Sequence, residues 1–299
     1  MVFNHIPGDG YDGFQDMKRM RKKREYAAVK QFPELPGLTL MQATYITQNF
    51  ARHSHDGFAF GVIEKGALEF SYRGEKLIAP PGSINLVNPD EPHDGHPATE
   101  EGWTYRMFYF DAGLFQRAAD LMSGKSVNLP FFQDGVIDDR DLASEIHSFH
   151  VSLSTETMGR LEMESRLLHM LVRFIRRHAD ISYPLLKAGR EHPAVLLAKR
   201  MIENLSHQDI SLAGLAAESG LSPFHLIRVF KAETGLTPHR YLSQVRVRRA
   251  EKLIRQGGDL ADTAFEVGFA DQSHLNRHFK GITGITPGVY RNFVQDAGF

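Results

Sequence analysis

The sequence contains no cysteine among its 299 residues. Disulfide bonds, thiolate zinc sites and cysteine nucleophiles are therefore excluded, and the composition fits a reducing compartment. The chain also has no run of about 18–20 apolar residues, the length that a membrane-spanning helix needs, and its N-terminus has no apolar signal core. We therefore expect a soluble, cytoplasmic protein without a membrane partner.

Motifs for catalysis are missing as well. There is no glycine-rich phosphate loop, and the serines, histidines and aspartates are too scattered to indicate a catalytic triad. We therefore expect neither an enzyme nor a bound cofactor.

The chain also has little net charge, only −1. That balance conceals an asymmetry, because residues 193–299 hold 13 Lys and Arg against 10 Asp and Glu, whereas residues 1–192 hold 22 against 26. Within residues 222–255 the ratio is 8 basic to 2 acidic. The C-terminal third can therefore attract nucleic acid although the whole chain is nearly neutral.

A segment that occurs twice near the C-terminus is the most informative part of the sequence. Residues 222–238 (SPFHLIRVFKAETGLTP) and 271–287 (DQSHLNRHFKGITGITP) are identical at 9 of 17 positions. Each copy follows a short helical stretch that ends in glycine, LAGLAAESG at 212–220 and LADTAFEVG at 260–268. Two copies do not make a solenoid. They indicate two small helical units placed side by side.

Local signals in each copy predict a helix, a tight turn and a second helix. Ser211 and Ser222 can each accept a hydrogen bond from an early backbone N–H and so begin a helix. Gly220, between them, can adopt the left-handed conformation that ends a helix. The second copy repeats the pattern with Gly268 and Asp271. This arrangement is typical of a helix-turn-helix unit.

The second helix of each unit has an inward apolar face and an outward face. In the first unit Leu226, Val229 and Phe230 are spaced to pack inward. The outward residues, which we expect to contact DNA, are Phe224, Ile227, Arg228 and Lys231 in the first unit and Gln272, Ser273, Asn276, Arg277 and Lys280 in the second. Arg can bind guanine, Asn or Gln can bind adenine, and an exposed Ile or Phe can contact a thymine methyl group. A solvated helix face is the alternative, but both copies carry Arg and Lys at equivalent positions.

A helix expected at roughly 238–256 joins the two units and is strongly basic. On this helix we expect Arg240, Arg246 and Arg249 to reach phosphates. Such contacts give affinity without sequence information.

Residues 193–293 resemble the DNA-binding domain of the AraC/XylS family of bacterial transcription regulators. The motif SHLNRHFKGITGITPGVYR at 273–291, after VGFAD at 267–271, carries the resemblance, which covers about a third of the chain. It implies an all-α domain whose rigid central helix presents two recognition helices to successive major grooves of promoter DNA. It also favours activation, with RNA polymerase as a partner.

By position, the family's base-contacting residues fall on a subset of the outward side chains. These residues are Phe224, Ile227 and Arg228 in the first unit and Gln272, Ser273, Asn276 and Arg277 in the second.

The N-terminal half has short alternating segments separated by Gly and Pro turns, which indicate a β-sandwich or barrel. HSHDGFAFGVIEKG at 53–66 and APPGSINLVNPDEPHDG at 79–95 resemble the cupin barrel of sugar-binding AraC-type sensors. The predicted fold is therefore α+β in two domains, a cupin-like barrel with two following helices and an all-α domain with two helix-turn-helix units. We place a basic, flexible arm at 1–25, the ligand-sensing and dimerisation domain at 26–179, a linker at 180–192 and the DNA-binding domain at 193–299.

Three histidines are expected to meet inside the barrel. His53 and His55 are two apart on an extended segment and face the same side, and His93 can join them. Three imidazoles suggest a metal, but the metal-binding cupin pattern has a carboxylate where this chain has Ala59. A small-molecule pocket is therefore favoured, for a sugar, an amino acid or an aromatic acid. Its expected lining is His53, His55, His93, Trp103 and Tyr105, and purely structural packing of these side chains is the alternative.

The second helix within residues 139–179 has two apolar stripes. One stripe is Leu161, Leu168, Leu171 and Ile175, and the other is Met163, Leu167, Met170 and Phe174. A helix that is apolar on two sides has to be covered twice. We expect a second subunit to cover the stripe that begins with Leu161 and the barrel to cover the other stripe. This arrangement predicts a homodimer. The alternative is one wide face buried against the barrel and the preceding helix.

These features predict a ligand-responsive, sequence-specific transcription regulator. A metal-dependent cupin enzyme fused to a DNA-binding domain is the main alternative, although Ala59 counts against it. A regulator whose barrel only dimerises, without a ligand, is a third.

Overall fold

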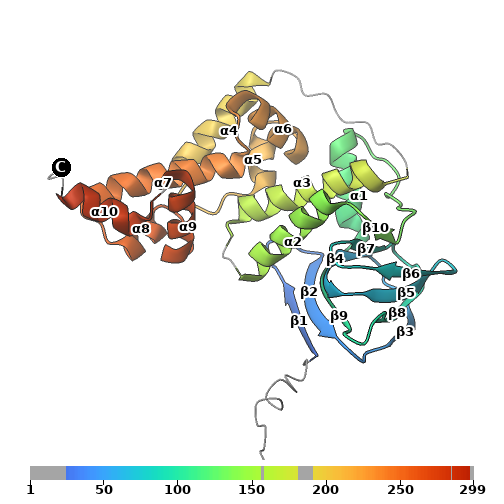
Figure 1. Ribbon diagram of the computed structural model, residues 1–299. Coiled ribbons are helices and arrows are strands. Elements are labelled where there is room, and N and C mark those ends of the chain that lie inside the picture. Colours follow the sequence, from blue (N-terminus) through green and yellow to red (C-terminus); the bar gives the residue numbers. More distant parts are fainter. Residues whose placement is uncertain (1–24, 156–157, 181–190, 284, 297–299) are drawn as a thin grey trace, which may run out of the picture.

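The computed structural model describes residues 25–155, 158–180, 191–283 and 285–296. Its N-terminal part is built of strands, its middle of three helices, and its C-terminal part of helices only (Figure 1). The predicted arm, apart from its last residue, and most of the predicted linker lie outside the described residues.

The strands form two antiparallel sheets that face each other. Their bounds are β1 (Tyr26–Gln31), β2 (Leu38–Tyr45), β3 (Phe50–His53), β4 (Phe58–Gly66), β5 (Leu68–Tyr72), β6 (Glu75–Ala79), β7 (Ile84–Val87), β8 (His93–Pro97), β9 (Trp103–Phe110) and β10 (Val136–Ile137). The larger sheet has the order β1-β2-β9-β4-β7-β10, and the smaller β3-β8-β5-β6. This architecture confirms the predicted cupin-like, β-rich domain.

Strand β4 is buried on both faces, which explains why its sequence, FAFGVIEKG, does not alternate cleanly. Ala59 and Ile63 point into the interior between the two sheets. Phe58 and Phe60 point the other way, into a core shared with helices. Gly61 lies where β4 meets β9, and a Cβ there would stand 2.1 Å from a carbonyl oxygen of β9. The strand therefore connects the barrel interior to the helical layer.

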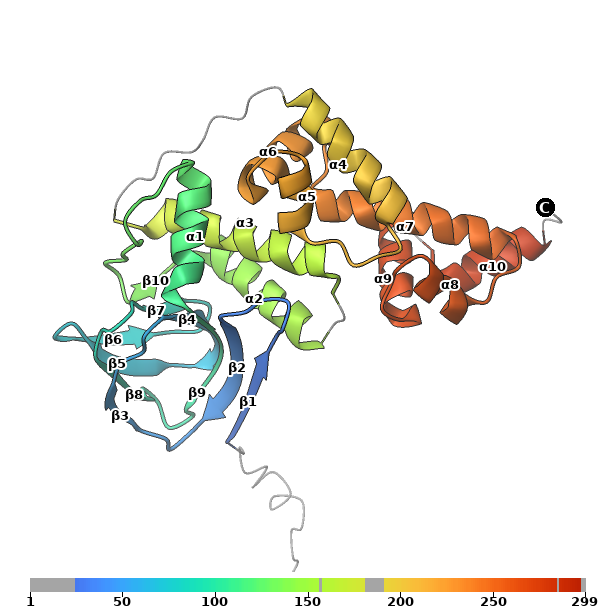
Figure 2. The same cartoon turned by 180° about the vertical axis from the view of Figure 1, so that it is seen from behind.

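Three helices cover the outer face of the larger sheet. They are α1 (Ala112–Ser123), α2 (Arg140–Thr155) and α3 (Arg160–His178). Aromatic rings fix this packing, because Phe174 of α3 stacks on Phe60 with ring centroids 4.6 Å apart and Phe115 of α1 lies 4.2 Å from Phe58. Both views show these helices between the barrel and the C-terminal helices (Figures 1 and 2).

The C-terminal helices form two helix-turn-helix units, as predicted. The helices are α4 (His192–Leu205), α5 (Leu212–Glu218), α6 (Pro223–Thr234), α7 (Pro238–Arg255), α8 (Leu260–Glu266), α9 (Gln272–Thr283) and α10 (Pro287–Asp296). The first unit is α5 with α6, the second is α8 with α9, and α7 joins them.

The predicted start and stop signals are present in both units. The Ser211 and Ser222 side chains accept hydrogen bonds from the N–H groups of Gly214 and His225. Gly220 has a φ of 68°. The second unit matches, with Gly268 at a φ of 96° and Asp271 accepting from the third residue of its helix at 2.7 Å.

The two units differ in the core to which they belong. Leu226, Val229 and Phe230 of α6 are buried, as predicted, but in a cluster continuous with α1, α3 and the larger sheet. Leu275 and Phe279 of α9 are buried in a separate cluster with α7 and α8. The first unit is therefore packed into the sensor domain, whereas the second has a core of its own.

Among the helices of the described ranges, none combines the length and apolar character that crossing a membrane requires.

Candidate DNA interface and effector site

Helix α9 presents the predicted base-reading residues on an accessible face. Gln272, Ser273, Arg277 and Lys280 are exposed, and Asn276 is half-buried. Positions 272, 273, 276, 277 and 280 follow helical spacing and so lie on one side of α9. The second unit thus has the composition and exposure of a recognition helix.

The face of α6 that is equivalent to the accessible face of α9 is mostly buried. Phe224 and Ile227 retain only 7% and 6% exposure, and both belong to the cluster shared with the sensor helices. Arg228 is half-buried, with its guanidinium 5.6 Å from the Phe224 ring, and Lys231 is exposed. We predicted that Phe224 and Ile227 face solvent, and this was wrong. The physical reason is that α6 packs against α1 and α3, so the apolar outward residues cover sensor surface.

The three arginines predicted to bind phosphate do not share one environment. Arg240 and Arg249 are exposed, although Arg249 donates to the Ser206 hydroxyl at 2.6 Å. Arg246 is 6% exposed and donates to the backbone carbonyls of Ser206 and Gln208 at 2.7 and 2.9 Å. Burial lowers the pKa of Arg246 to about 10, so it stays charged at neutral pH. The predicted outward position of Arg246 was wrong, because this side chain holds the turn after α4 against α7.

Further contacts of α3 join the sensor domain to the C-terminal helices. The Glu164 carboxylate accepts a hydrogen bond from the backbone N–H of Leu212 at 2.5 Å, at the start of α5. Leu161 lines a small cavity of about 20 Å³ together with Ile210 and Leu242. Helix α3 contacts α5, α6 and α7. We call this arrangement, in which α3 and α1 cover α6, the closed state.

The stripe that we assigned to a dimer interface is buried inside one chain. Leu161, Leu168, Leu171 and Ile175 are all less than a tenth exposed and belong to the shared core. The prediction that a second subunit covers this stripe was therefore wrong for the closed state. The sequence shows two apolar faces on α3, but it does not show that α1 and the C-terminal helices of the same chain cover one of them.

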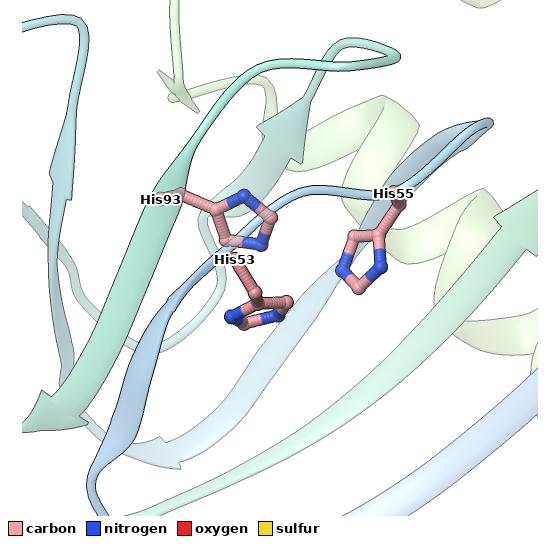
Figure 3. A group of neighbouring side chains, drawn as sticks. All are labelled: His53, His55 and His93. Atoms are coloured by element: carbon pink, nitrogen blue, oxygen red, sulfur yellow. The ribbon is translucent and has the colours of Figure 1, made fainter.

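The three barrel histidines do come together (Figure 3). Their ring centroids are 4.4 Å apart for His53 and His93, and 4.9 Å apart for each pair that includes His55. The Nδ1 atoms of His53 and His93 lie 2.7 and 3.0 Å from backbone carbonyl oxygens, so their Nε2 atoms remain available. Burial lowers the pKa of His55 to about 4 and also lowers that of His93. Neutral rings at this position can donate or accept hydrogen bonds.

Trp103 and Tyr105 lie deeper in the same interior. Both rings are buried, 6.2 Å apart, on the face of β9 that points between the sheets. The Trp103 indole N–H is buried without a hydrogen-bond partner in the described part of the chain. A buried, unpaired N–H usually has a functional or solvent explanation, and a ligand oxygen would satisfy it.

Sequence reasoning missed several aromatic side chains of this interior. Tyr45 of β2 lies 5.3 Å from Trp103, Phe50 of β3 lies 6.2 Å from it, and Tyr109 of β9 lies 5.4 Å from the His55 ring. Tyr109 connects the histidines to the Trp103 end of the barrel. The period of two along β9 could have identified it, because positions 103, 105 and 109 share one face of the strand.

The barrel group consists of three imidazoles, and no carboxylate of the described residues belongs to it. Ala59 points into the interior, where the metal-binding pattern would place an acid. The next acid along β4, Glu64, instead pairs with Arg106 at 2.7 Å and His147 at 2.8 Å on the other side of the sheet. Three imidazoles can still hold a divalent ion, but an acid to act on a substrate is missing from this group.

An open cleft borders the histidine group at His55. It has a volume of about 790 Å³ and is lined by His55 and Tyr109 and by residues of segments 31–39 and 54–58. Small-molecule sites commonly have volumes of this order, about 300–1,000 Å³.

A barrel with an aromatic and imidazole interior, joined to paired helix-turn-helix units, defines a DNA-binding transcription regulator with a sensor domain. Residues 35–171 match the AraC-like ligand binding domain and residues 215–292 match a helix-turn-helix domain. The chain is 31% identical over 230 residues to YbfI, an uncharacterized HTH-type transcriptional regulator of Bacillus subtilis (strain 168). The aligned region covers 77% of this chain and 82% of YbfI. The chain therefore belongs to the AraC family of helix-turn-helix transcriptional regulators.

Other known proteins resemble it over the same regions. The transcriptional activator RhaS of Klebsiella pneumoniae (strain 342) is 25% identical over 244 residues, covering 77% of this chain and 84% of RhaS. Among solved structures, the DNA-binding domain of AdpA in complex with a target DNA is 27% identical, covers 36% of this chain and 96% of that one, and has a TM-score of 0.33.

Proposed function

We propose that this regulator is an effector-responsive transcriptional activator whose closed state withholds one of its two DNA-reading helices. The observation that carries the proposal is the burial of Phe224 and Ile227 on the DNA-reading side of α6. A helix cannot enter a major groove while that side is packed against α1 and α3. Binding through both units therefore requires the DNA-binding domain to separate from the sensor.

In the open state, both recognition helices read promoter DNA. We assign base contacts to Arg228 with its apolar neighbours on α6, and to Gln272, Ser273, Asn276 and Arg277 on α9, with Lys231 and Lys280 nearby. Arg240 and Arg249 on α7 contact phosphates. Because α7 joins the units rigidly, the site spans two successive major grooves, about 34 Å apart, and has no dyad symmetry within one monomer.

The effector occupies the barrel interior. His53, His55 and His93 offer hydrogen bonds near the mouth, and Trp103 and Tyr105 offer apolar faces with polar tips deeper inside. The unpaired indole N–H of Trp103 supports a ligand with an oxygen acceptor. A sugar, an amino acid and an aromatic acid all have such an oxygen.

Strand β4 gives a physical route from the effector to α6. Its Ala59 and Ile63 line the interior, while Phe58 and Phe60 pack against the helices that cover α6. A ligand that displaces the inner face of β4 alters the aromatic packing under α1 and α3. For this to switch the protein, the effector must bind the open state more tightly than the closed state.

Dimerisation fits the same switch. Opening exposes part of the apolar stripe of Leu161, Leu168, Leu171 and Ile175 on α3, and the same helix of a second subunit can then cover it. We therefore propose a homodimer of the open state that acts with RNA polymerase in the cytoplasm.

The test is fluorescence-anisotropy binding to DNA upstream of the protein's own gene and its neighbours, at fixed physiological salt. A scrambled duplex and the Arg228→Ala/Arg277→Ala double variant are the controls. We expect binding to one duplex at least ~1,000-fold tighter than to scrambled DNA, lost in the double variant and strengthened by the effector. Equal, weak binding to every duplex, with and without candidate effectors, would reject the proposal.

The geometry of the three histidines also supports a second candidate, a metal ion bound in the barrel. His53, His55 and His93 would hold it through their Nε2 atoms, and the ion would supply a Lewis acid beside the effector. Elemental analysis of untagged protein and of His55→Gln tests this. A stoichiometric ion that His55→Gln loses would also reopen the question of a cupin enzyme.

A further inference from the structure

Two histidines of α9 and one glutamate of α3 meet where the second helix-turn-helix unit contacts the sensor domain. His274 and His278 are four residues apart, so they project from one face of the helix, and their Nε2 atoms are 2.9 Å apart. The Glu162 Oε2 atom lies 3.8 Å from the His278 Nε2 atom. The potential ligand atoms of all three lie within 4.8 Å of one another. We call these three residues the interdomain cluster.

We propose that the interdomain cluster binds a divalent transition-metal ion such as Zn²⁺. Two imidazole nitrogens and one carboxylate oxygen form a ligand set that zinc uses, with a fourth position left for water. On a tetrahedral ion with metal–ligand distances of about 2.0–2.1 Å, the ligand atoms are about 3.3 Å apart. The separations of 2.9 and 3.8 Å lie on either side of this value. Small side-chain rotations therefore bring the atoms into place.

The surroundings keep the imidazoles in the neutral form and orient them. Phe269 stacks on the His278 ring at 5.4 Å and meets the His274 ring edge-on at 5.1 Å. Burial, more than the neighbouring charges, lowers the pKa of His274 to about 3 and that of His278 to about 4. Between two neutral rings one Nε2–H donates to the other Nε2. For a metal ion to bind between the two Nε2 atoms, the donating ring would shift its proton from Nε2 to Nδ1, so that both rings bind as neutral imidazoles.

Charge decides which residue matters most to this site. Arg246 and Arg277 place positive charge near both histidines, and Arg166 lies 3.5 Å from the Glu162 carboxylate. These groups oppose a cation, so the site depends on the negative charge of Glu162. Replacement of Glu162 by its neutral isostere Gln should therefore weaken binding of the ion strongly without removing side-chain volume.

An ion at this position would tie the recognition helix α9 to the sensor helix α3. This consequence rests on the proposed DNA-binding role of α9. Since the ligands come from both domains, the ion binds the closed state and not the open state, and by linkage it opposes DNA binding. The first unit has Val229 at the position equivalent to His278. The link is therefore confined to the second unit.

The experiment separates this cluster from the barrel histidines. Full-length protein carrying His53→Gln, which disables the barrel group, is stripped with chelator and titrated with Co²⁺ and then Zn²⁺, with Co²⁺ absorption reporting coordination. We expect one equivalent to bind, and Glu162→Gln and His278→Gln each to weaken it about tenfold or more. His169→Gln removes an exposed imidazole from the same helix α3 and should change nothing. Circular dichroism establishes that each variant is folded.

Two results would overturn the proposal: no Co²⁺ binding in the His53→Gln protein, or unchanged binding in both Glu162→Gln and His278→Gln. The same proteins are then tested on DNA, where Zn²⁺ should weaken binding by the His53→Gln protein but not by its Glu162→Gln derivative. Zn²⁺ bound at the cluster without any effect on DNA affinity would reject the link between domains. Absence of specific DNA binding under every condition would instead reject the proposed regulator function. The metal titration would still decide whether the interdomain cluster binds an ion.

Discussion

The two helix-turn-helix units share sequence and local geometry, yet they differ in what covers them. At equivalent positions the first unit has Phe224 and Ile227 where the second has Ser273 and Asn276. The apolar pair is buried against α1 and α3, whereas Ser273 is exposed and Asn276 half-buried. The same helical scaffold therefore carries two different surfaces, one suited to a protein neighbour and one suited to bases.

This difference implies different roles for the two units. A recognition helix with apolar outward residues can pack on the sensor when DNA is absent and can meet thymine methyl groups when DNA is present. A polar recognition helix gains little from such packing and stays accessible. We infer that the first unit carries the response to effector and the second carries most of the sequence preference.

The largest effect should come from removing the equivalent core phenylalanine of each unit. Phe230 and Phe279 are fully buried, the first in the core shared with the sensor and the second in the separate C-terminal cluster. Each change to Ala should cost about 3–5 kcal/mol. Phe279→Ala should unfold the second unit locally and leave the barrel protected, whereas Phe230→Ala should destabilise sensor and first unit together. Hydrogen exchange by mass spectrometry measures this, and equal loss of barrel protection in both variants would contradict the comparison of cores.

Loss of the outward arginine from the second unit should have the next largest effect. Arg277→Ala should weaken specific binding by about 1–3 kcal/mol and relax base preference at one position. The matched change in the first unit, Arg228→Ala, should matter less without effector, because α6 is then covered. Binding measured across a panel of single-base variants tests this. Unchanged specific affinity for Arg277→Ala would show that α9 does not read bases with this face.

The features of the fold and of the site that could be predicted from the sequence are those specified by residues close together in the chain. Serine or aspartate caps, turn glycines and helical spacing determine each helix-turn-helix unit within a short segment, so both units and their inward faces were predicted correctly. The two-residue spacing of His53 and His55 likewise placed both rings on one side. Nothing equally local indicates that two apolar positions on α6 face another domain.

The errors share one cause, because each concerned a face whose neighbour is distant in the chain. Phe224, Ile227 and the Leu161 stripe were expected to be accessible to DNA or to a second subunit, although in the closed state the sensor and DNA-binding domains of one chain cover them together. Arg246 was assigned to phosphate because its charge is evident from the sequence, while the carbonyls of Ser206 and Gln208 that bind it are not. Amphipathic spacing shows that an apolar helix face has to be buried, and only the tertiary structure shows which element packs against it.

A smaller effect should follow from loosening the contact that the sensor makes with the first unit. Glu164→Ala removes the carboxylate that accepts from the Leu212 N–H, a hydrogen bond to a charged group worth roughly 1.5 kcal/mol. We expect effector-free DNA affinity to rise about tenfold and the effector response to shrink. Glu145→Ala is the control, because Glu145 pairs with Arg173 inside the sensor domain. If both variants leave effector-free affinity unchanged, the closed state does not limit DNA binding.

The smallest and most uniform effect should come from α7, which belongs to neither unit alone. Arg249 is exposed one helical turn from the buried Arg246, so the two variants compare the proposed phosphate contact with a structural role. Arg249→Ala should weaken binding to all sequences alike and reduce the slope of log affinity against log salt by about 1. Its melting temperature should fall only by the loss of one hydrogen bond, the one to the Ser206 hydroxyl. Arg246→Ala should lower the melting temperature more, because it leaves the backbone carbonyls of Ser206 and Gln208 without their donor, and the Ser206 bond is buried. A sequence-dependent loss in Arg249→Ala would mean that α7 contributes to base readout, and the division of work between the two units would then have to include the helix that joins them.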